Sequence, residues 1–154
     1  MLAPRRIRSD PPRPGASFRE RGFSFIPLRQ AHLDFLQFVY GREVPKLDEV
    51  VGRAMVDESY LPLGVVLVHF EPNGTNTLHA HFGKWLKVYP KDVLRGMSEV
   101  CNWLREHEVF ILHAIADESV PGSDYLLEWL GATPENRRNE IGPIYRLDLR
   151  KCKI

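Results

Sequence analysis

The sequence has little cysteine, almost no excess charge and no long apolar run. Its two cysteines, Cys101 and Cys152, are too few for a disulfide framework, so we expect a protein of a reducing, cytoplasmic setting. A formal net charge of +1 creates no overall field that would attract nucleic acid or a membrane. No apolar run approaches the roughly 18 residues that span a bilayer, and no apolar segment follows the N-terminal arginines, as a secretory signal requires. We therefore expect neither a membrane protein nor a secreted disulfide scaffold.

Arginine and proline are unevenly distributed. A chain of 154 residues with 44% apolar residues can form one domain around its own core. Residues 1–22, however, contain six arginines and four prolines against two acidic residues, a composition that suits neither a helix nor a sheet interior. We interpret residues 1–22 as a basic, extended arm. It is either a solvated tail or a segment that docks on a protein or nucleic acid.

Apolar spacing in the rest of the chain predicts alternating strands and helices. Strands are predicted over residues 23–26, 55–57, 63–70, 77–82, 109–116 and 142–151, and helices over residues 31–40, 46–53, 124–130 and from residue 90 onward. Asn73-Gly74 is a strong hairpin signal, whereas residues 137–140 are interpreted as an exposed loop. A strand, a long helix and a second strand in succession predict a right-handed parallel crossover. The fold class is therefore α/β, with a central mixed sheet flanked by helices.

Four phrases, in this order, resemble the GNAT superfamily of N-acetyltransferases. "FSFIPLRQAHLDFL" is similar to the opening strand and first helix of that family, and "MVDESYLPLGVVLV" to its second and third strands. "NGTNTLHAHF" resembles the hairpin into the fourth strand, and "DYLLEWLGAT" the last helix with its closing Leu-Gly. The resemblance covers residues 23 to about 150. It implies a GNAT-like acyl-CoA N-acyltransferase fold for residues 23–154.

The resemblance also implies acetyl-CoA as a co-substrate and an amine as acceptor. In this family the sheet splays beside the fourth strand, whose backbone binds pantetheine, and a glycine-rich turn before the next helix binds the pyrophosphate. Here "GKWLKVYPKDV" stands in place of that turn, so lysine side chains are expected to replace backbone donors. The implied cofactor-binding residues are Leu78, Ala80, Phe82, Gly83, Lys84, Lys87 and Lys91.

Two positions near the end of the chain depart from the family pattern. The asparagine of the family falls at Val120, and its tyrosine, which protonates the leaving thiolate, falls at Leu127. Tyr125 lies two positions away and is the best available acid.

The stretch "HAHFGKW" places His79 and His81 two residues apart. On a strand both side chains point to one face, about 6.5–7 Å apart. A metal site would need His69 or His113 as further ligands, and we expect no metal. The other two interpretations are a histidine pair that lines the site, and ordinary packing. If the protein is an enzyme, the candidate bases are Glu71, His79 and His81, since imidazole titrates near neutral pH.

Two functions from different classes therefore remain. The first is an N-acetyltransferase that acts on an amine. The second is a catalytically degenerate GNAT-like module that binds a partner through residues 1–22. Such small proteins loosely resemble ones encoded by bacteriophages, some of them virion components, in which case the location would be the virion.

Overall fold

The chain folds around one mixed sheet. In this computed structural model the described residues are 23–40, 44–82, 90–118 and 121–154. The strands are β1 (Ser24–Pro27), β2 (Val50–Val56), β3 (Pro62–Phe70), β4 (Asn76–Phe82), β5 (Ile111–Ile115), β6 (Thr133–Arg138) and β7 (Pro143–Asp148). The helices are α2 (Gln30–Tyr40), a 3₁₀ turn η1 (Leu47–Glu49), α3 (Pro90–Glu106) and α4 (Ser123–Leu130). The predicted arm, residues 1–22, lies outside the described residues.

The seven strands are ordered β1-β2-β3-β4-β5-β7-β6. Neighbours are antiparallel except β4 and β5, which are parallel and joined by the long helix α3. The mixed sheet, the hairpin between β3 and β4 and the helical crossover agree with the sequence prediction. Within the described residues, none of the helices combines the length and apolar character needed to cross a membrane.

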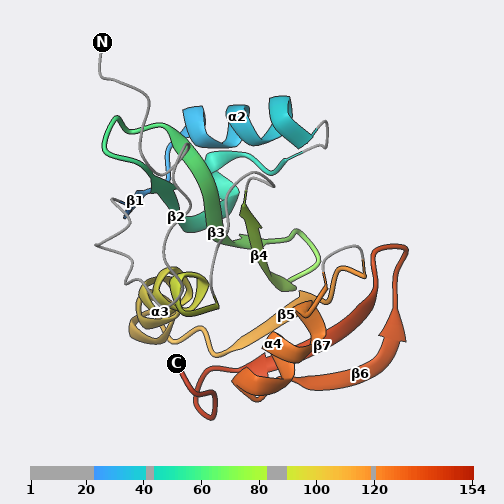
Figure 1. Ribbon diagram of the computed structural model, residues 1–154. Coiled ribbons are helices and arrows are strands. Elements are labelled where there is room, and N and C mark those ends of the chain that lie inside the picture. The colour runs from blue at the N-terminus through green and yellow to red at the C-terminus, as the bar shows by residue number, and fades with distance from the viewer. Residues whose placement is uncertain (1–22, 41–43, 83–89, 119–120) are drawn as a thin grey trace.

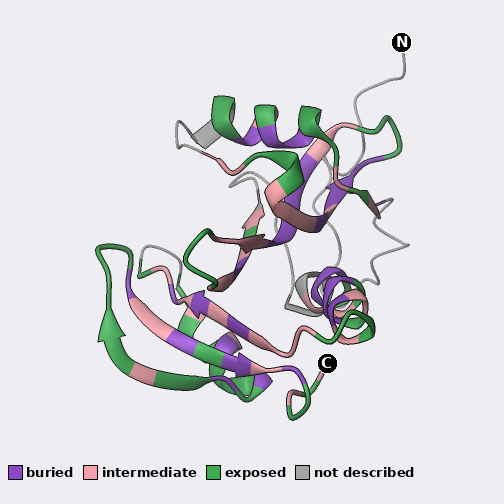
Figure 2. Ribbon diagram, turned by 180° about the vertical axis from the view of Figure 1, so that it is seen from behind, coloured by how far each residue is buried: buried purple, intermediate pink, exposed green. Residues whose placement is uncertain are grey.

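Helices cover both faces of the sheet (Figure 1). Leu33 and Leu36 of α2 pack on Ala54, Val65 and Leu67 on one face, which we call the α2 side. Apolar residues of α3 and α4 pack on the opposite face against the alternate residues of β3, β4, β5 and β7. Figure 2 shows this arrangement as buried stripes along the inner faces of the helices. The larger core therefore lies on the α3 side, and the α2 side is covered by a single helix near β2 and β3.

The helix predicted over residues 46–53 is wrong. Only Leu47–Glu49 forms a short 3₁₀ turn, and Val50–Val56 is strand β2. Strand β2 is paired on both sides, with β1 and with β3, so ladder hydrogen bonds and β-branched residues such as Val50 and Val51 override the local helical spacing. Gly52 suits this position, because a Cβ there would lie 2.5 Å from the carbonyl oxygen of Val66.

Strand β6 was not predicted at all. It runs over Thr133–Arg138 at the edge of the sheet and is almost wholly exposed. Its polar sequence contains Pro134, and its register against β7 shifts between Pro134 and Arg138. Proline and a bulge are typical of edge strands, but in the sequence they resemble a loop.

Candidate functional site

Strands β4 and β5 separate part of the way along their length. Seven residue pairs join β4 to β3, from Phe70↔Asn76 to Gly64↔Phe82. In contrast, only Thr77↔His113 and Leu78↔Ala114 join β4 to β5. Among the described residues no pair continues beyond Leu78 and Ala114, which we call the branch point. Beyond the branch point β4 continues to pair with β3, no described β5 residue pairs with it, and the two strands run apart in Figure 1.

The residues of β4 alternate between the two faces of the sheet. Leu78 belongs to the core on the α3 side, so Ala80 points the same way and Thr77, His79 and His81 point to the α2 side. Opposite them on β3 lie His69, Leu67 and Val65. The α2 side of the sheet near the branch point thus carries several histidines beyond the area that α2 covers.

His79 and His81 form a stacked pair. Their ring centroids are 5.8 Å apart and the rings are inclined by 21°. Burial is the main cause that lowers the pKa of His79 to about 4, the neighbouring His81 and His69 contribute in the same direction, and Glu71 opposes them. His79 is therefore neutral at physiological pH and can accept a hydrogen bond through an unprotonated ring nitrogen.

Glu71 is held close to the histidine pair by the hairpin. The hydroxyl of Thr77, a buried residue, donates a hydrogen bond to the Glu71 carboxylate. The turn is closed by bonds from the Glu71 amide to Thr75 (2.9 Å) and from the Gly74 amide to Glu71 (3.0 Å). Gly74 has φ +87°, which a side chain would strain. The predicted Asn-Gly turn therefore positions the carboxylate that lies beside His79.

Two further histidine–carboxylate pairs flank β4. His69 Nε2 lies 3.1 Å from Glu49 Oε2 on the β3 side, and His113 Nε2 lies 3.0 Å from Glu135 Oε1 on the β5 side. The sequence interpretation considered both histidines only as possible metal ligands. Where the structure describes the chain, no three His, Cys, Asp or Glu side chains are grouped as a metal site requires.

The His113–Glu135 pair is the feature of the candidate site that sequence reasoning missed. Glu135 lies on β6, which was not predicted, and its own neighbours are Pro134 and a polar edge sequence. Nothing in the sequence connects residue 135 to residue 113, because the contact depends on the sheet order β5-β7-β6.

The predicted cofactor-binding residues differ in burial, and some of them lie outside the described residues. The side chain of Leu78 is buried at the branch point, Ala80 is exposed, and Phe82 ends β4. Lys91 lies in the first turn of α3. Gly83, Lys84 and Lys87 lie outside the described residues.

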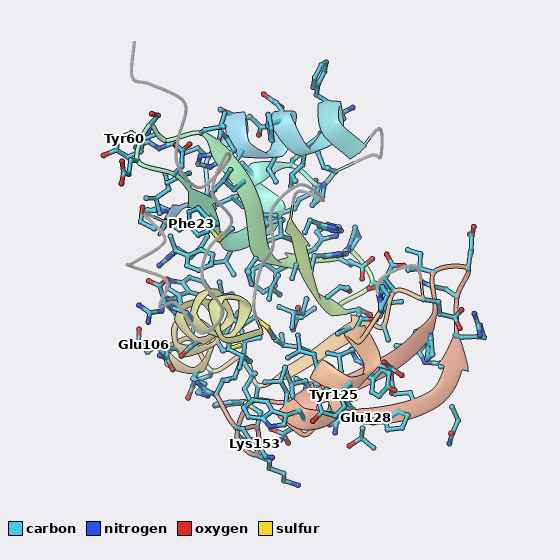
Figure 3. All side chains as sticks on the ribbon, in the orientation of Figure 1. Phe23, Tyr60, Glu106, Tyr125, Glu128 and Lys153 are labelled. Carbon is cyan, nitrogen blue, oxygen red and sulfur yellow. The ribbon has the colours of Figure 1, made fainter. Side chains whose placement is uncertain are left out.

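Tyr125 is not brought together with the histidines. It lies on α4 with 71% of its surface exposed, and α4 packs on the α3 side of the sheet. Figure 3 shows Tyr125 beside Glu128 on α4, apart from β4. Leu127, at the position of the family tyrosine, is buried in the core. The described residues thus place no tyrosine hydroxyl of α4 at the branch point.

Comparison with solved structures identifies the fold. A GNAT-family acetyltransferase from Staphylococcus aureus superposes with a TM-score of 0.59 at 9% identity, covering 82% of this chain and 99% of that one. The spermidine/spermine N-acetyltransferase of Vibrio cholerae gives a TM-score of 0.59 at 8% identity, with 82% and 91% covered. No protein-family model matches the sequence, and no curated protein matches it. The chain therefore has a GNAT-like fold, as the resemblance implied, at identities that concern the fold alone.

Proposed function

We propose that the protein transfers an acetyl group from acetyl-CoA to an amine. The observation that carries this proposal is the separation of β4 from β5 beyond Leu78 and Ala114 in a chain with a GNAT-like fold. The edge of β4 that faces away from β3 beyond the branch point suits the amide groups of pantetheine, because an extended chain can add to the edge of a strand. When bound, acetyl-CoA supplies the thioester that the amine attacks.

The cofactor-binding residues follow from this placement. Leu78 closes the base of the opening, and Ala80 and Phe82 continue along its β4 wall. Lys91 lies in the first turn of α3, where a cation and the positive end of the helix dipole both favour phosphate. Gly83, Lys84 and Lys87 remain predicted contacts of the pyrophosphate.

The acceptor amine is proposed to bind on the α2 side, next to His79 and His81. The neutral ring of His79 accepts a hydrogen bond from the amine, and Glu71 lies beside it as a compensating negative charge. His79 is a poor final acceptor for a proton, because burial and two neighbouring histidines disfavour its charged form. Its role here is to orient the amine.

The test is an acetyl-transfer assay that measures free coenzyme A thiol with acetyl-CoA and a panel of primary amines, spermidine included. We expect thiol release that depends on the amine and falls at least about tenfold in His79→Gln. The matched control is His107→Gln, at the exposed end of α3. No amine-dependent release with any acceptor in the panel would contradict the proposal.

A second function is favoured by one observation, the burial of Leu127 where the family has its tyrosine. A GNAT-fold module that has lost the chemistry would bind a partner through residues 1–22, as degenerate phage-encoded proteins are expected to do. It predicts a co-purifying partner that is lost when residues 1–22 are deleted, together with no binding of acetyl-CoA.

A further inference from the structure

His113 occupies the base of the opening on the α2 side of the sheet. It is aligned with Thr77, one residue before the branch point, and its side chain is 21% exposed. The acetyl-transfer proposal places the reacting groups at this point of the sheet, yet it assigns no role to His113.

The two ring nitrogens of His113 have different surroundings. Nε2 lies 3.0 Å from the Glu135 carboxylate. Nδ1 is buried and has no hydrogen-bond partner among the described residues. Buried polar atoms are nearly always paired, so an unpaired ring nitrogen beside a proposed reaction site requires an explanation.

The protonation of Glu135 determines which nitrogen carries the proton. A hydrogen bond from Arg137 lowers the pKa of Glu135, and the nearby His113 and Arg146 lower it further. Glu135 is therefore ionised at neutral pH and can only accept. Nε2 must then carry the ring proton, which leaves a lone pair on Nδ1.

A positive charge is better accommodated on His113 than on His79. The groups around His113 are Glu135 and Arg137 of β6, Arg146 of β7 and Thr77 of β4. Of these, the Glu135 carboxylate lies 3.0 Å from Nε2 of the ring. A proton on His79 would instead face His81 and His69. This contrast separates a residue that can hold a proton from one that can only orient the amine.

We propose that His113, held in place by Glu135, takes the proton from the acceptor amine through Nδ1. Because this atom is closed to solvent, the step requires that the bound amine displaces the groups that cover it. The inference rests on the proposed acetyl transfer and adds its base. In this step an N–H bond of the acceptor ammonium breaks, its electron pair stays on the amine nitrogen, and a new N–H bond forms at Nδ1. The imidazolium that results lies against the Glu135 carboxylate, which stabilises it as a carboxylate does in other histidine–carboxylate pairs.

The kinetic test compares two equivalent histidine–glutamate pairs. We expect His113→Asn and Glu135→Gln to lower kcat about 100-fold or more, with the KM for acetyl-CoA within about twofold, as expected when only a transition-state interaction is lost. His113→Asn should also remove the acidic limb of the pH–rate profile. The control His69→Asn disrupts a pair with nearly the same distance, whose histidine is similarly exposed, and it should keep the wild-type kcat and pH–rate profile.

A second measurement needs no activity and no variant. Nitrogen-15 NMR of imidazole-labelled wild-type protein at pH 7 should show His113 protonated on Nε2 and unprotonated on Nδ1. The opposite tautomer would overturn the inference, and so would wild-type kcat and pH dependence in His113→Asn. If wild-type protein transfers no acetyl group at all, the proposed function fails and this catalytic role fails with it. If transfer is normal and only His113→Asn has no effect, this inference alone is wrong.

Discussion

At the scale of single residues, the histidines near β4 differ in their surroundings more than in their chemistry. His79 is neutral because it is buried and lies beside His81 and His69. His69 and His113 each contact a glutamate. The alternation of a strand, which the sequence contains, places His79 and His81 on one face. The distance between His113 and Glu135 follows from no local pattern in the sequence, because the two residues lie on strands β5 and β6.

We predict that the pH dependence of stability depends on His79. Its pKa of about 4 in the folded protein lies below the unfolded value of 6.5, so the unfolded chain binds a proton between these limits and the folded protein does not. The free energy of unfolding is therefore highest above pH 6.5 and falls as the pH drops toward 4. Between pH 7.5 and 4.5 the free energy of unfolding, measured with urea, should fall by about 2–3 kcal/mol less in His79→Gln than in the wild type.

The control for this prediction is His107→Gln, an exposed residue at the end of α3. The free energy of unfolding of this variant should fall as the pH is lowered, by the same amount as in the wild type. Parallel curves for wild type and His79→Gln would mean that His79 titrates normally and is open to solvent.

At the scale of elements, α3 is fixed to the first strand by a close contact at Gly96. A Cβ at this position would lie 2.6 Å from Cζ and 2.8 Å from Cε1 of Phe25. Alanine favours a helix by about 1 kcal/mol, but displacing a packed ring costs about 1–3 kcal/mol. We therefore expect Gly96→Ala to lower the free energy of unfolding by about 1 kcal/mol, measured by urea denaturation.

A second background, Phe25→Leu, tests whether contact with the Phe25 ring causes the loss of stability in Gly96→Ala. In a Phe25→Leu background the smaller side chain leaves room, so Gly96→Ala should be neutral or stabilising there. Glu99→Ala, exposed on the same helix, should change stability little in either background. A stabilising effect of Gly96→Ala in the wild-type chain would show that the ring and the helix are not in contact.

A second link joins α3 to the segment after β7. The Arg105 guanidinium donates hydrogen bonds to the carbonyl of Leu149 (2.9 Å), to Asn102 Oδ1 (2.8 Å) and to Cys152 Sγ (3.1 Å). Arg105→Met keeps the aliphatic stem and removes these donors, so we expect a loss of about 2 kcal/mol in thermal or urea unfolding.

Arg150→Met is the comparison, because Arg150 is an exposed arginine paired with Asp148. Exposed ion pairs contribute little to stability, so its effect should be the smaller of the two. An equal or larger loss in Arg150→Met would mean that the Arg105 link does not hold the C-terminal segment.

The elements that were predicted correctly have local sequence patterns, whereas those that were missed depend on pairing with distant strands. Strands β3 and β5 have strongly apolar or β-branched residues in short runs, and α3 has a regular apolar face, so their types follow from local patterns. Strand β4 follows from the Asn73-Gly74 hairpin signal. The first part of strand β2, residues 50–53, was interpreted as a helix because its pairing partners lie outside any local window, whereas its end falls in the strand predicted over residues 55–57. Strand β6 is defined by pairing with β7 alone, and its polar residues carry no periodic signal.

At the scale of the whole molecule, the sheet consists of two parts that share only a short ladder. Strands β1 to β4 form one part and β5, β7 and β6 the other, and two residue pairs connect them. The resemblance predicted a splayed sheet, but no local pattern locates the branch point at Leu78 and Ala114. His113 and its acidic partner Glu135 both belong to the second part, whereas His79 and His81 belong to the first, so the proposed base and the proposed amine site meet only when both parts are assembled.

The opening itself can be blocked without disturbing the core. Ala80 is exposed on β4 beyond the branch point, so Ala80→Trp should fill the space assigned to pantetheine while leaving the melting temperature near that of wild type. We expect this variant to lose acetyl-CoA binding at least about tenfold, measured by calorimetry, since a bulky ring displaces the ligand. Ala31→Trp, exposed on α2, is the control and should bind as wild type does. Unchanged affinity in Ala80→Trp would place the ligand elsewhere.

The most direct measurement is a titration of the wild-type protein with acetyl-CoA, followed residue by residue by backbone amide NMR. The account predicts saturable binding, with the largest shifts in residues 78–82 and 111–115 on the two sides of the branch point. No saturable shifts at millimolar acetyl-CoA, or shifts confined to residues away from β4 and β5, would contradict it.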